Sequence, residues 1–409
     1  MHKPIRLVHF ADVHVGMENY GRLDTDSGTS TRVRDFLDRI DEVIQYACDN
    51  DADIAVFAGD AFKTRDPNPT YQREFAIRMK KLADKMPLLL LVGNHDVPGM
   101  ASRASSVDIF DALNVPNVTV GDGSGGKVIE TTNGPLFLGW LAYPMRNRLL
   151  VKDEYKDKSV HDLDMALLNK VGDIIGDLSD QAKRYDTIPR VFCTHLSVSE
   201  AKLGSERSVM LGKDITIDKS LFDQDVWDYI ALGHIHKHQD VNKGSYPAVV
   251  YSGSLERIDF GEEKEPKGFC WVELQRSSTS WEFVSVNARP FLTIRVDVRG
   301  DSDPTESILK KIASKDISGV VVRLVLQIKT HDLQKIKDKE IANALSDAHS
   351  YSIVKDVDHE ARTRIGGVAA ETLSSEELLE RYFIDKGYDS DTIKLLMNIA
   401  NDIILADQD

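Results

Sequence analysis

The chain has 409 residues, of which 42% are hydrophobic, and carries a formal net charge of −15 at pH 7. This length predicts two or more domains, and the apolar content is ordinary for a globular protein. No apolar run reaches the roughly 18 residues that a membrane span needs, so we expect no membrane segment. The negative charge argues against a broad nucleic-acid-binding surface, although a metal site with nearby Lys and Arg side chains can still bind phosphates.

The cysteines and the start of the chain predict a cellular compartment. Cys48, Cys193 and Cys270 are far apart and odd in number, which favours a reducing cytoplasm over a disulfide framework. The chain enters its first strand without the pattern of a signal peptide. We therefore expect a cytoplasmic protein.

The first predicted strand, Ile5–Phe10, is followed at once by metal-binding residue types. Asp12 and His14 are two residues apart, so their side chains point the same way from a strand end. A helix is predicted over residues 33–47, and a second buried strand leads into Gly59-Asp60. Strand, helix and strand in this order predict a βαβ unit.

The third strand, Leu88–Val92, is apolar throughout, as expected for a parallel strand buried on both faces. Gly93 permits a sharp turn, and Asn94, His95 and Asp96 follow. Ligands of open α/β sheets bind beyond the carboxyl ends of the strands. Taken alone, these three residues are equally compatible with a polar turn after a core strand.

Two helices are predicted next, over residues 67–85 and 106–113, and each has one apolar face. Such a face either packs on the sheet of its own chain or forms a helical dimer contact. The apolar residues concerned are Phe75, Met79, Leu82 and Phe110.

Further strands end in histidine. After short strands at 127–130 and 136–141 and a helix at 162–180, the strand 188–195 ends in His195. The strand 228–233 is followed by His234 and His236. Five strand ends that carry Asp, His or Asn in one chain predict a shared metal site, because Asp and His side chains bind the same divalent cations.

These residues resemble, in order, the five motifs of calcineurin-like metallophosphoesterases: Asp12-x-His14, Gly59-Asp60, Gly93-Asn94-His95-Asp96, His195 and Gly233-His234-x-His236. Two other features resemble one branch, the SbcD and Mre-type double-strand-break-repair nucleases. One is Tyr251–Glu262 with the following Lys267-Gly268, and the other is the layout of elements after residue 285.

The resemblance implies an α/β fold made of three parts. Residues 1–286 would form a four-layer α/β/β/α nuclease sandwich, and 287–370 a small α/β capping domain that helps to admit DNA. Residues 371–409 would form a C-terminal helical hairpin. The pattern of the middle part agrees with strands at 291–298, 320–328 and 351–357 and helices at 303–313 and 333–347.

The resemblance also implies a site for two Mn²⁺ ions, with Fe²⁺ or Mg²⁺ as other possibilities. Asp60 would bridge the ions. One ion would be bound by Asp12, His14 and His236, and the other by Asn94, His195 and His234. His95 would act on the phosphate or the leaving oxygen without binding metal, and Asp96 would orient its ring.

The expected activity is 3′–5′ exonuclease and single-strand endonuclease cleavage of DNA ends, hairpins and single strands, near the nucleoid. Archaeal and eukaryotic relatives often have a histidine where this chain has Lys63. A lysine can contact phosphate as a point charge but cannot reproduce imidazole chemistry, so the balance of the two activities stays open. Glu256 and Arg257 in the branch signature form either a structural salt bridge or a DNA contact.

The tail predicts two short amphipathic helices. Ser374 and Glu377 fit a capping box, and Gly387 would end the first helix. Short helices must bury their apolar stripes on their own protein or on a partner. The resemblance implies that they bind an SMC-like ATPase of the SbcC type and that the nuclease forms a homodimer. The predicted partner-binding residues are Leu378, Tyr382, Phe383, Leu396, Ile399 and Ile403.

Two other functions remain open on the sequence. The same metal ligands would serve a phosphoesterase that acts on nucleotides or phosphoproteins. A non-catalytic scaffold could keep the fold without its metals, but every expected ligand position is occupied by a suitable residue here.

Overall fold

The structure is a computed structural model, and it describes residues 3–25, 28–97, 104–150, 159–204, 215–222, 225–358, 375–390, 392–397 and 400. The chain divides into two compact units. The first comprises Met1–Thr293, Ile317–Val322 and Asp347–Tyr351, and the second Ile294–Asp316, Arg323–Ser346 and Ser352–Asp409. The two domain boundaries expected from the sequence, after residues 286 and 370, stay predictions.

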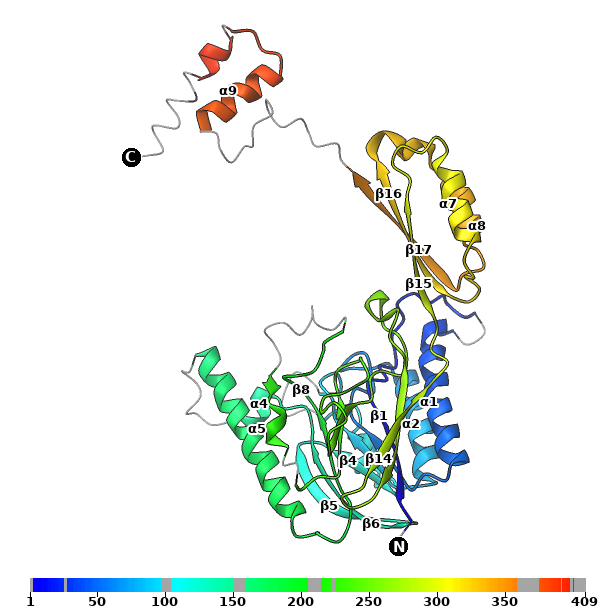
Figure 1. The fold of residues 1–409 in the computed structure, drawn as a ribbon, viewed down its shortest axis with the longest axis vertical. Helices are drawn as coiled ribbons and strands as arrows, with labels where there is room; N and C mark the ends of the chain where they lie inside the picture. The colour runs from blue at the N-terminus through cyan, green and yellow to red at the C-terminus, as the bar shows by residue number, and fades with distance from the viewer. Residues whose placement is uncertain are drawn as a thin grey trace. The chain divides into compact units, whose positions relative to one another are not determined.

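The first unit is built around two six-stranded sheets, drawn between the helices in Figure 1. In the first sheet, β1 to β4 are parallel, as the βαβ pattern predicts, and two antiparallel strands complete the other edge. The strand order is β14 (Ser280–Ser285), β13 (Gly268–Leu274), β1 (Ile5–Phe10), β2 (Ile54–Phe57), β3 (Leu88–Leu91) and β4 (Val118–Gly121).

The second sheet has four parallel strands in its centre and an antiparallel strand at each edge. Its β5–β6 hairpin contains both of the short strands expected between residues 127 and 141. The strand order is β11 (Gln239–Asp240), β12 (Ala248–Tyr251), β10 (Tyr229–Gly233), β7 (Arg190–His195), β6 (Gly134–Leu141) and β5 (Ser124–Thr131).

Helices cover the outer face of each sheet. The helices α1 (Thr31–Asp49) and α2 (Pro69–Ala83) lie against the first sheet, and α5 (Val160–Ala182) lies on the opposite side of the unit (Figure 1). Ser30, Asn68 and Ser159 cap these helices by accepting backbone N–H bonds, which is why the chain turns into a helix at these points.

Apolar burial holds these layers together. One cluster of buried side chains combines both sheets with α1 and α2, and a second joins α5 to the outer face of the second sheet. The fold is therefore the predicted four-layer α/β/β/α sandwich. The shorter elements are α3 (Ile109–Ala112), α4 (Arg146–Leu149), β8 (Ser197–Val198), β9 (Thr216–Ile217), η2 (Lys219–Leu221) and η3 (Phe260–Glu262).

The residues expected at a dimer contact belong to the core instead. Phe75, Met79 and Leu82 on α2 are 0% exposed, and Phe110 on α3 is 5% exposed. The rings of Phe75 and Phe110 are 6.4 Å apart, so they pack on each other inside the chain. These four side chains cannot contact a second copy in the folded protein, and their role as dimer residues was wrong.

The second unit contains most of a three-stranded sheet in the order β15 (Phe291–Asp297), β16 (Val321–Lys329) and β17 (Ser350–Asp358). Its helix α7 (Pro304–Ala313) agrees with the helix predicted over 303–313. The Asp303 side chain caps this helix by accepting the backbone N–H of Glu306. The helix expected over 333–347 is interrupted, because Ile336 is extended and the Lys337 N–H donates to Thr305 Oγ1. The result is η4 (Thr330–Lys335) followed by α8 (Asp338–Ala344), and α9 (Ser375–Asp385) lies in the tail.

Two expectations from composition can be compared with the described residues. Among them we find no helix that is both long and apolar enough to cross a membrane. The three cysteines are unpaired, and Cys193 and Cys270 are buried.

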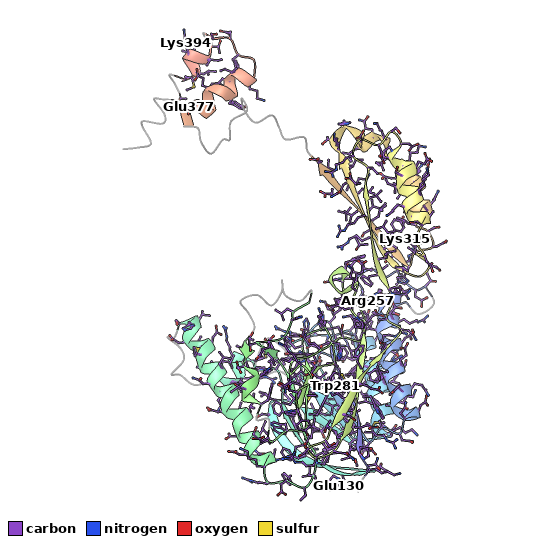
Figure 2. The ribbon with its side chains drawn as sticks, in the orientation of Figure 1. Glu130, Arg257, Trp281, Lys315, Glu377 and Lys394 are labelled. Atoms are coloured by element: carbon purple, nitrogen blue, oxygen red, sulfur yellow. The ribbon has the colours of Figure 1, made fainter. Side chains whose placement is uncertain are left out.

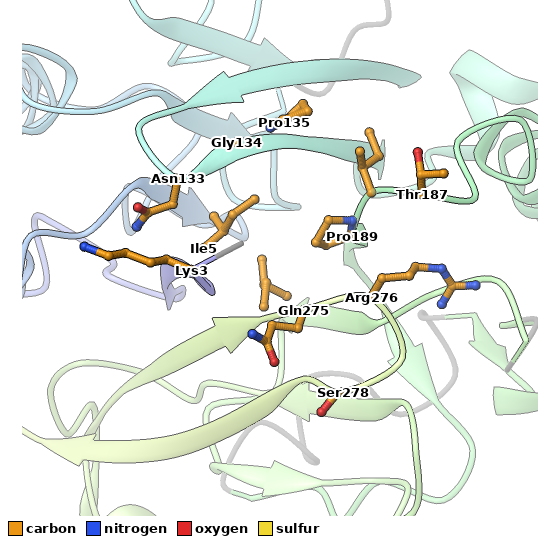
Figure 3. Close-up of a pocket in the computed structure, with 12 residues that line it drawn as sticks. Lys3, Ile5, Asn133, Gly134, Pro135, Thr187, Pro189, Gln275, Arg276 and Ser278 are labelled. Atoms are coloured by element: carbon orange, nitrogen blue, oxygen red, sulfur yellow. The ribbon is translucent and has the colours of Figure 1, made fainter. Parts of the chain in front are cut away.

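A pocket of about 480 Å³ opens between the sheets in the first unit (Figure 3). It is lined by Ile5 at the start of β1, Pro135 near the start of β6, and Pro189 just before β7. It therefore lies at the amino ends of these parallel strands, at the edge opposite the polar strand ends.

Candidate metal centre

The five polar strand ends meet at one edge of the sandwich. Because β1, β2 and β3 are parallel in one sheet and β7 and β10 in the other, their carboxyl ends face the same way. Three groups of side chains there have donor atoms within 4.8 Å of one another. They are Asp12, His14 and His236; His14, Asp60 and His95; and Asp12, Asp60 and His195.

The first group joins the ends of β1 and β10. The Nε2 atoms of His14 and His236 lie 3.0 Å apart, although 222 positions separate the two residues in the chain. The Asp12 carboxylate accepts the backbone N–H of His234, with Oδ1 at 3.0 Å. This hydrogen bond ties the end of the first sheet to the end of the second beside the two rings.

The donors form two groups: the first group is Asp12, His14 and His236, and the second group is Asn94, His195 and His234. The second group is centred on an amide oxygen. Asn94 Oδ1 lies 2.9 Å from His195 Nε2 and 3.0 Å from His234 Nδ1. The other nitrogen of His195, Nδ1, donates to the carbonyl oxygen of Ala58 at 2.7 Å. That bond leaves Nε2 directed toward Asn94.

The Asp60 carboxylate lies between the two groups. Its Oδ1 atom is 3.4 Å from His195 Nε2, and its Oδ2 atom is 3.7 Å from His14 Nε2. Each carboxylate oxygen thus faces a different group of donors. This is the arrangement that a bridging carboxylate requires.

The backbone adopts unusual conformations where these side chains converge. Asp12, His14, Asp60 and His234 have φ angles of 52°, 49°, 63° and 98°. Residues with a Cβ rarely occupy this left-handed region, and such strain gathers at functional sites. The strand ends therefore turn sharply enough to direct adjacent side chains into one space.

Gly93 is required for a different reason from the one expected. A Cβ atom at this position would lie 2.2 Å from Asp60 Oδ1, and no left-handed φ angle is involved. Because Gly93 has no side chain, its backbone can lie close to the Asp60 carboxylate. The sequence suggested instead that the glycine was needed for a sharp turn. Gly59 does combine a φ angle of 99° with a close approach, to His195.

Burial and mutual contacts set the charges of these groups. Burial lowers the pKa of His14 well below its usual value, so that the ring is neutral. Burial acts to raise the pKa of Asp60, but His195 and His95 outweigh it and hold the pKa well below its usual value. Burial opposes the charge on His195, but Asp60 and Asp12 outweigh it and raise its pKa to about 9. The Asp60 carboxylate is thus ionised, and together with Asp12 it favours positive charge at this point of the centre.

His95 and Asp96 do not interact as the sequence suggested. The Nδ1 atom of His95 lies 2.8 Å from the carbonyl oxygen of Lys63, which therefore orients the ring. The Asp96 carboxylate accepts the backbone N–H groups of Gly93, Asp60 and Ala61 at 2.9–3.0 Å. The prediction that Asp96 orients His95 was wrong, because its oxygens are occupied in shaping the turns that hold Asp60.

Arg257 contacts the chain itself. Its side chain is labelled in Figure 2, and its guanidinium group donates to the carbonyl oxygens of Ala288, Arg289 and Glu265 at 2.9–3.2 Å. Glu256 is 0% exposed and accepts the backbone N–H of Arg289 at 3.0 Å. The structure supports a structural role for both residues, but not as a salt bridge with each other: Glu256 lies 3.8 Å from Arg32 and from Arg39, and Arg257 contacts backbone oxygens.

One aromatic residue beside the centre was missed. The ring of Tyr143, which follows β6, lies 5.7 Å from that of His234 and 6.3 Å from that of His195. It forms part of the wall around the second group. An aromatic residue just after a strand that shares the sheet with β7 and β10 was the available signal.

Comparison with known proteins identifies this centre. The profile of calcineurin-like phosphoesterases matches residues 5–238, which include every residue of both groups. The chain belongs to the calcineurin-like phosphoesterase family. Membership implies a site for two divalent metal ions, and the residues present fit it. Imidazole nitrogens, carboxylates and an amide oxygen converge there, and such mixed nitrogen and oxygen donors suit borderline divalent cations.

Two curated relatives are similar to this phosphoesterase over different shares of its length. The SbcD component of the nuclease SbcCD from Bacillus subtilis is 26% identical over 291 residues, covering 69% of this chain and 70% of that protein. The DNA double-strand break repair protein Mre11 of Methanocaldococcus jannaschii is 25% identical over 410 residues, covering 96% of this chain and 95% of that protein.

The predicted partner-binding residues lie in a partly described tail. Gly387 has a φ angle of 78° and follows α9, which agrees with its predicted role at the helix end. Tyr382 is 45% exposed, and Phe383 packs its ring on Tyr382 and Tyr388. Leu396 is half-buried. Ser374, Ile399 and Ile403, and the side chain of Leu378, lie outside what the structure describes.

Proposed function

We propose that this phosphoesterase is a DNA nuclease that processes ends and hairpins in double-strand-break repair. The position of Asp60 between two groups of donor atoms carries the proposal, because hydrolysis of a phosphodiester by two cations needs one bridging carboxylate. The names of the relatives support DNA as the substrate.

In this proposal Asp12, His14 and His236 bind one metal ion, Asn94, His195 and His234 bind the other, and Asp60 binds both. Two cations bound there would activate a water and stabilise the attacking and leaving oxygens of the phosphodiester. We propose Mn²⁺ as the activating ion, with Fe²⁺ and Mg²⁺ as alternatives, since the donors mix four imidazole nitrogens with carboxylate and amide oxygens.

His95 acts on the substrate in this scheme. Its Nδ1 atom is occupied by the Lys63 carbonyl, so Nε2 is the nitrogen left to meet the phosphate or the leaving oxygen. The ring centroid lies 5.0 Å from that of His14, which places His95 beside the first group. Lys63, whose backbone carbonyl contacts His95, has a half-buried side chain. This side chain would provide a positive charge for the DNA backbone.

The tail would bind an SMC-like ATPase of the SbcC type. Tyr382, Ile384 and Leu395 expose 45%, 58% and 62% of their surface. Exposed apolar side chains on short helices suit the helix-in-groove mode of recognition. The domain division at 286 and 370 and a cytoplasmic, nucleoid-associated location belong to the same proposal.

We also propose a homodimer, but through other residues than those first expected. Ile77 on α2 and Ile109 and Leu113 at α3 are 55%, 54% and 68% exposed. They come from the two helices whose buried faces meet at Phe75 and Phe110. Apolar patches often mark protein contacts, and we propose that these three side chains form one.

The decisive experiment compares substrates with the full chain and Mn²⁺. Hairpin DNA, single-stranded DNA and p-nitrophenyl phosphate are offered at equal concentration, and the products from end-labelled DNA distinguish 3′–5′ exonuclease from endonuclease cleavage. We expect cleavage of both DNA substrates. Efficient hydrolysis of p-nitrophenyl phosphate with intact DNA would favour the alternative phosphoesterase, and the absence of both activities would favour a scaffold.

A further inference from the structure

A buried ion pair lies behind His236, on the side away from His14. Glu262 ends η3 and Lys267 precedes β13, and both side chains are 0% exposed. Lys267 Nζ lies 2.9 Å from Glu262 Oε2. Two buried charges carry a large cost of desolvation, so this pair has to be explained by what it contacts.

The two carboxylate oxygens of Glu262 contact different groups. Oε1 lies 2.9 Å from His236 Nδ1, while Oε2 binds Lys267 and accepts the backbone N–H of Ile258 at 2.9 Å. An ionised carboxylate can only accept hydrogen bonds. His236 therefore carries a proton on Nδ1, which leaves Nε2, the atom that lies 3.0 Å from His14 Nε2, as the nitrogen directed toward the first metal ion.

Lys267 supports the same histidine from a second direction. Its ammonium group donates to the backbone carbonyl oxygen of His236 at 3.2 Å and to Ser254 Oγ at 2.9 Å. It also keeps Glu262 charged, because an ammonium at 2.9 Å favours the carboxylate over the carboxylic acid. Side chain and backbone of His236 are thus held by one connected unit.

The Nδ1 atom of His236 contacts a carboxylate, in contrast to the Nδ1 atoms of His195 and His95. The Nδ1 atoms of His195 and His95 face neutral backbone carbonyl oxygens. A carboxylate in this position fixes the ring and raises the basicity of its other nitrogen, and loss of such a partner typically weakens metal binding roughly 10–100-fold.

We propose that Glu262 is a positioning residue that sets the tautomer and orientation of His236 for the first metal ion, and that Lys267 holds both the Glu262 carboxylate and the His236 backbone in place. The inference rests on the proposed function, in which His236 binds metal. It assigns to the Glu262–Lys267 part of the sequence signature a specific task.

The test is Glu262→Gln. Because Lys267 and the Ile258 N–H both donate at the Oε2 position, the amide oxygen must stay there, and the NH₂ group then faces His236 Nδ1. This amide donates to Nδ1 and moves the ring proton to Nε2, where the lone pair is needed. We expect one of two Mn²⁺ sites to weaken roughly 10–100-fold by calorimetry, and DNA cleavage to recover at saturating Mn²⁺.

The matched control is Glu265→Gln. Glu265 Oε2 lies 3.6 Å from the same Lys267 Nζ, so the variant removes a carboxylate near the ammonium without replacing the Glu262 contact to His236. It should bind both Mn²⁺ ions as the wild type does. If Glu262→Gln is unstable because Lys267 is left unpaired, the double variant with Lys267→Met removes both charges and should show the same loss at one site.

The results separate this inference from the proposed function. Two unchanged sites in Glu262→Gln, or an equal loss in Glu265→Gln, would overturn the positioning role while the proposed function stands. A wild-type chain that binds no second Mn²⁺ would overturn the proposed function itself.

Discussion

His9 on β1 and Tyr229 on β10 form a hydrogen bond between the two sheets, with His9 Nδ1 at 3.1 Å from the Tyr229 hydroxyl. Both side chains are 0% exposed. The bond crosses the centre of the sandwich, where nearly all neighbours are apolar. A titratable ring at this position ties the stability of the sandwich to pH.

Burial lowers the pKa of His9 from 6.5 to about 3. The unfolded chain takes up a proton as the pH falls below its own pKa, and the folded chain does not, so stability is lost between these two values. From about pH 7.5 to about pH 5.5 we expect the wild type to lose about 1.4 kcal/mol more than His9→Asn. Urea unfolding at each pH, with chelator present in both samples, measures the difference. Parallel profiles for the two proteins would contradict it.

Asp60→Ala tests the bridge between the metal ions. Since its two oxygens face His195 and His14 separately, both Mn²⁺ sites should weaken together. Hydrolysis should fall by orders of magnitude, while the circular dichroism spectrum stays that of a folded protein. Asp122→Ala, which removes a partner of Arg148, is the control and should bind Mn²⁺ normally. Two unperturbed sites in Asp60→Ala would rule out the bridging role.

His95→Asn separates catalysis from metal binding. We expect two bound Mn²⁺ ions and a rate about 10²–10⁴-fold lower, because general acid–base assistance is typically of this size. His238→Asn is the control, since that ring stacks on Phe283 at 4.1 Å and binds the Tyr251 carbonyl. Loss of a metal ion with unchanged activity per bound metal would make His95 a ligand.

Ile77→Glu, combined with Leu113→Glu, should convert the proposed homodimer to a monomer. Both side chains are exposed, so the charges disturb an interface without entering the core. Light scattering at micromolar concentration measures the mass, and Val160→Glu on α5, at an equally exposed position, should remain a dimer. A wild type that is already monomeric would remove this part of the proposal.

Deletion of Ser374–Asp409 should abolish binding of the SMC-like ATPase and leave Mn²⁺-dependent cleavage of single-stranded DNA intact. The metal centre lies entirely in the first unit, which does not include the tail. A pull-down with purified ATPase compares the truncated and full chains. Equal capture of both would exclude the tail as the main contact, and Tyr382→Asp in the full chain should weaken capture without truncation.

From the sequence alone, the strands and the main helices were predicted, and so were side chains that the structure brings together at one edge of the sandwich. An apolar run predicts a buried strand, and the Gly-Asp, Asn-His or His-x-His that follows it marks where the strand ends. Because these polar residues directly follow the strand in the sequence, their position at the strand end could be predicted. Parallel strands bring their carboxyl ends to one edge. Asp60 and His195 were therefore predicted to meet, although several strands lie between them in the sequence.

Only the tertiary structure decided which atoms face each other. A periodic pattern reports that a side chain is buried, but not against what, so Phe110 could be assigned to a dimer contact until the structure placed it on Phe75. Hydrogen bonds between distant turns leave no periodic signal. For this reason the Lys63 carbonyl behind His95 and the Glu262 carboxylate behind His236 became visible only when the chain was folded.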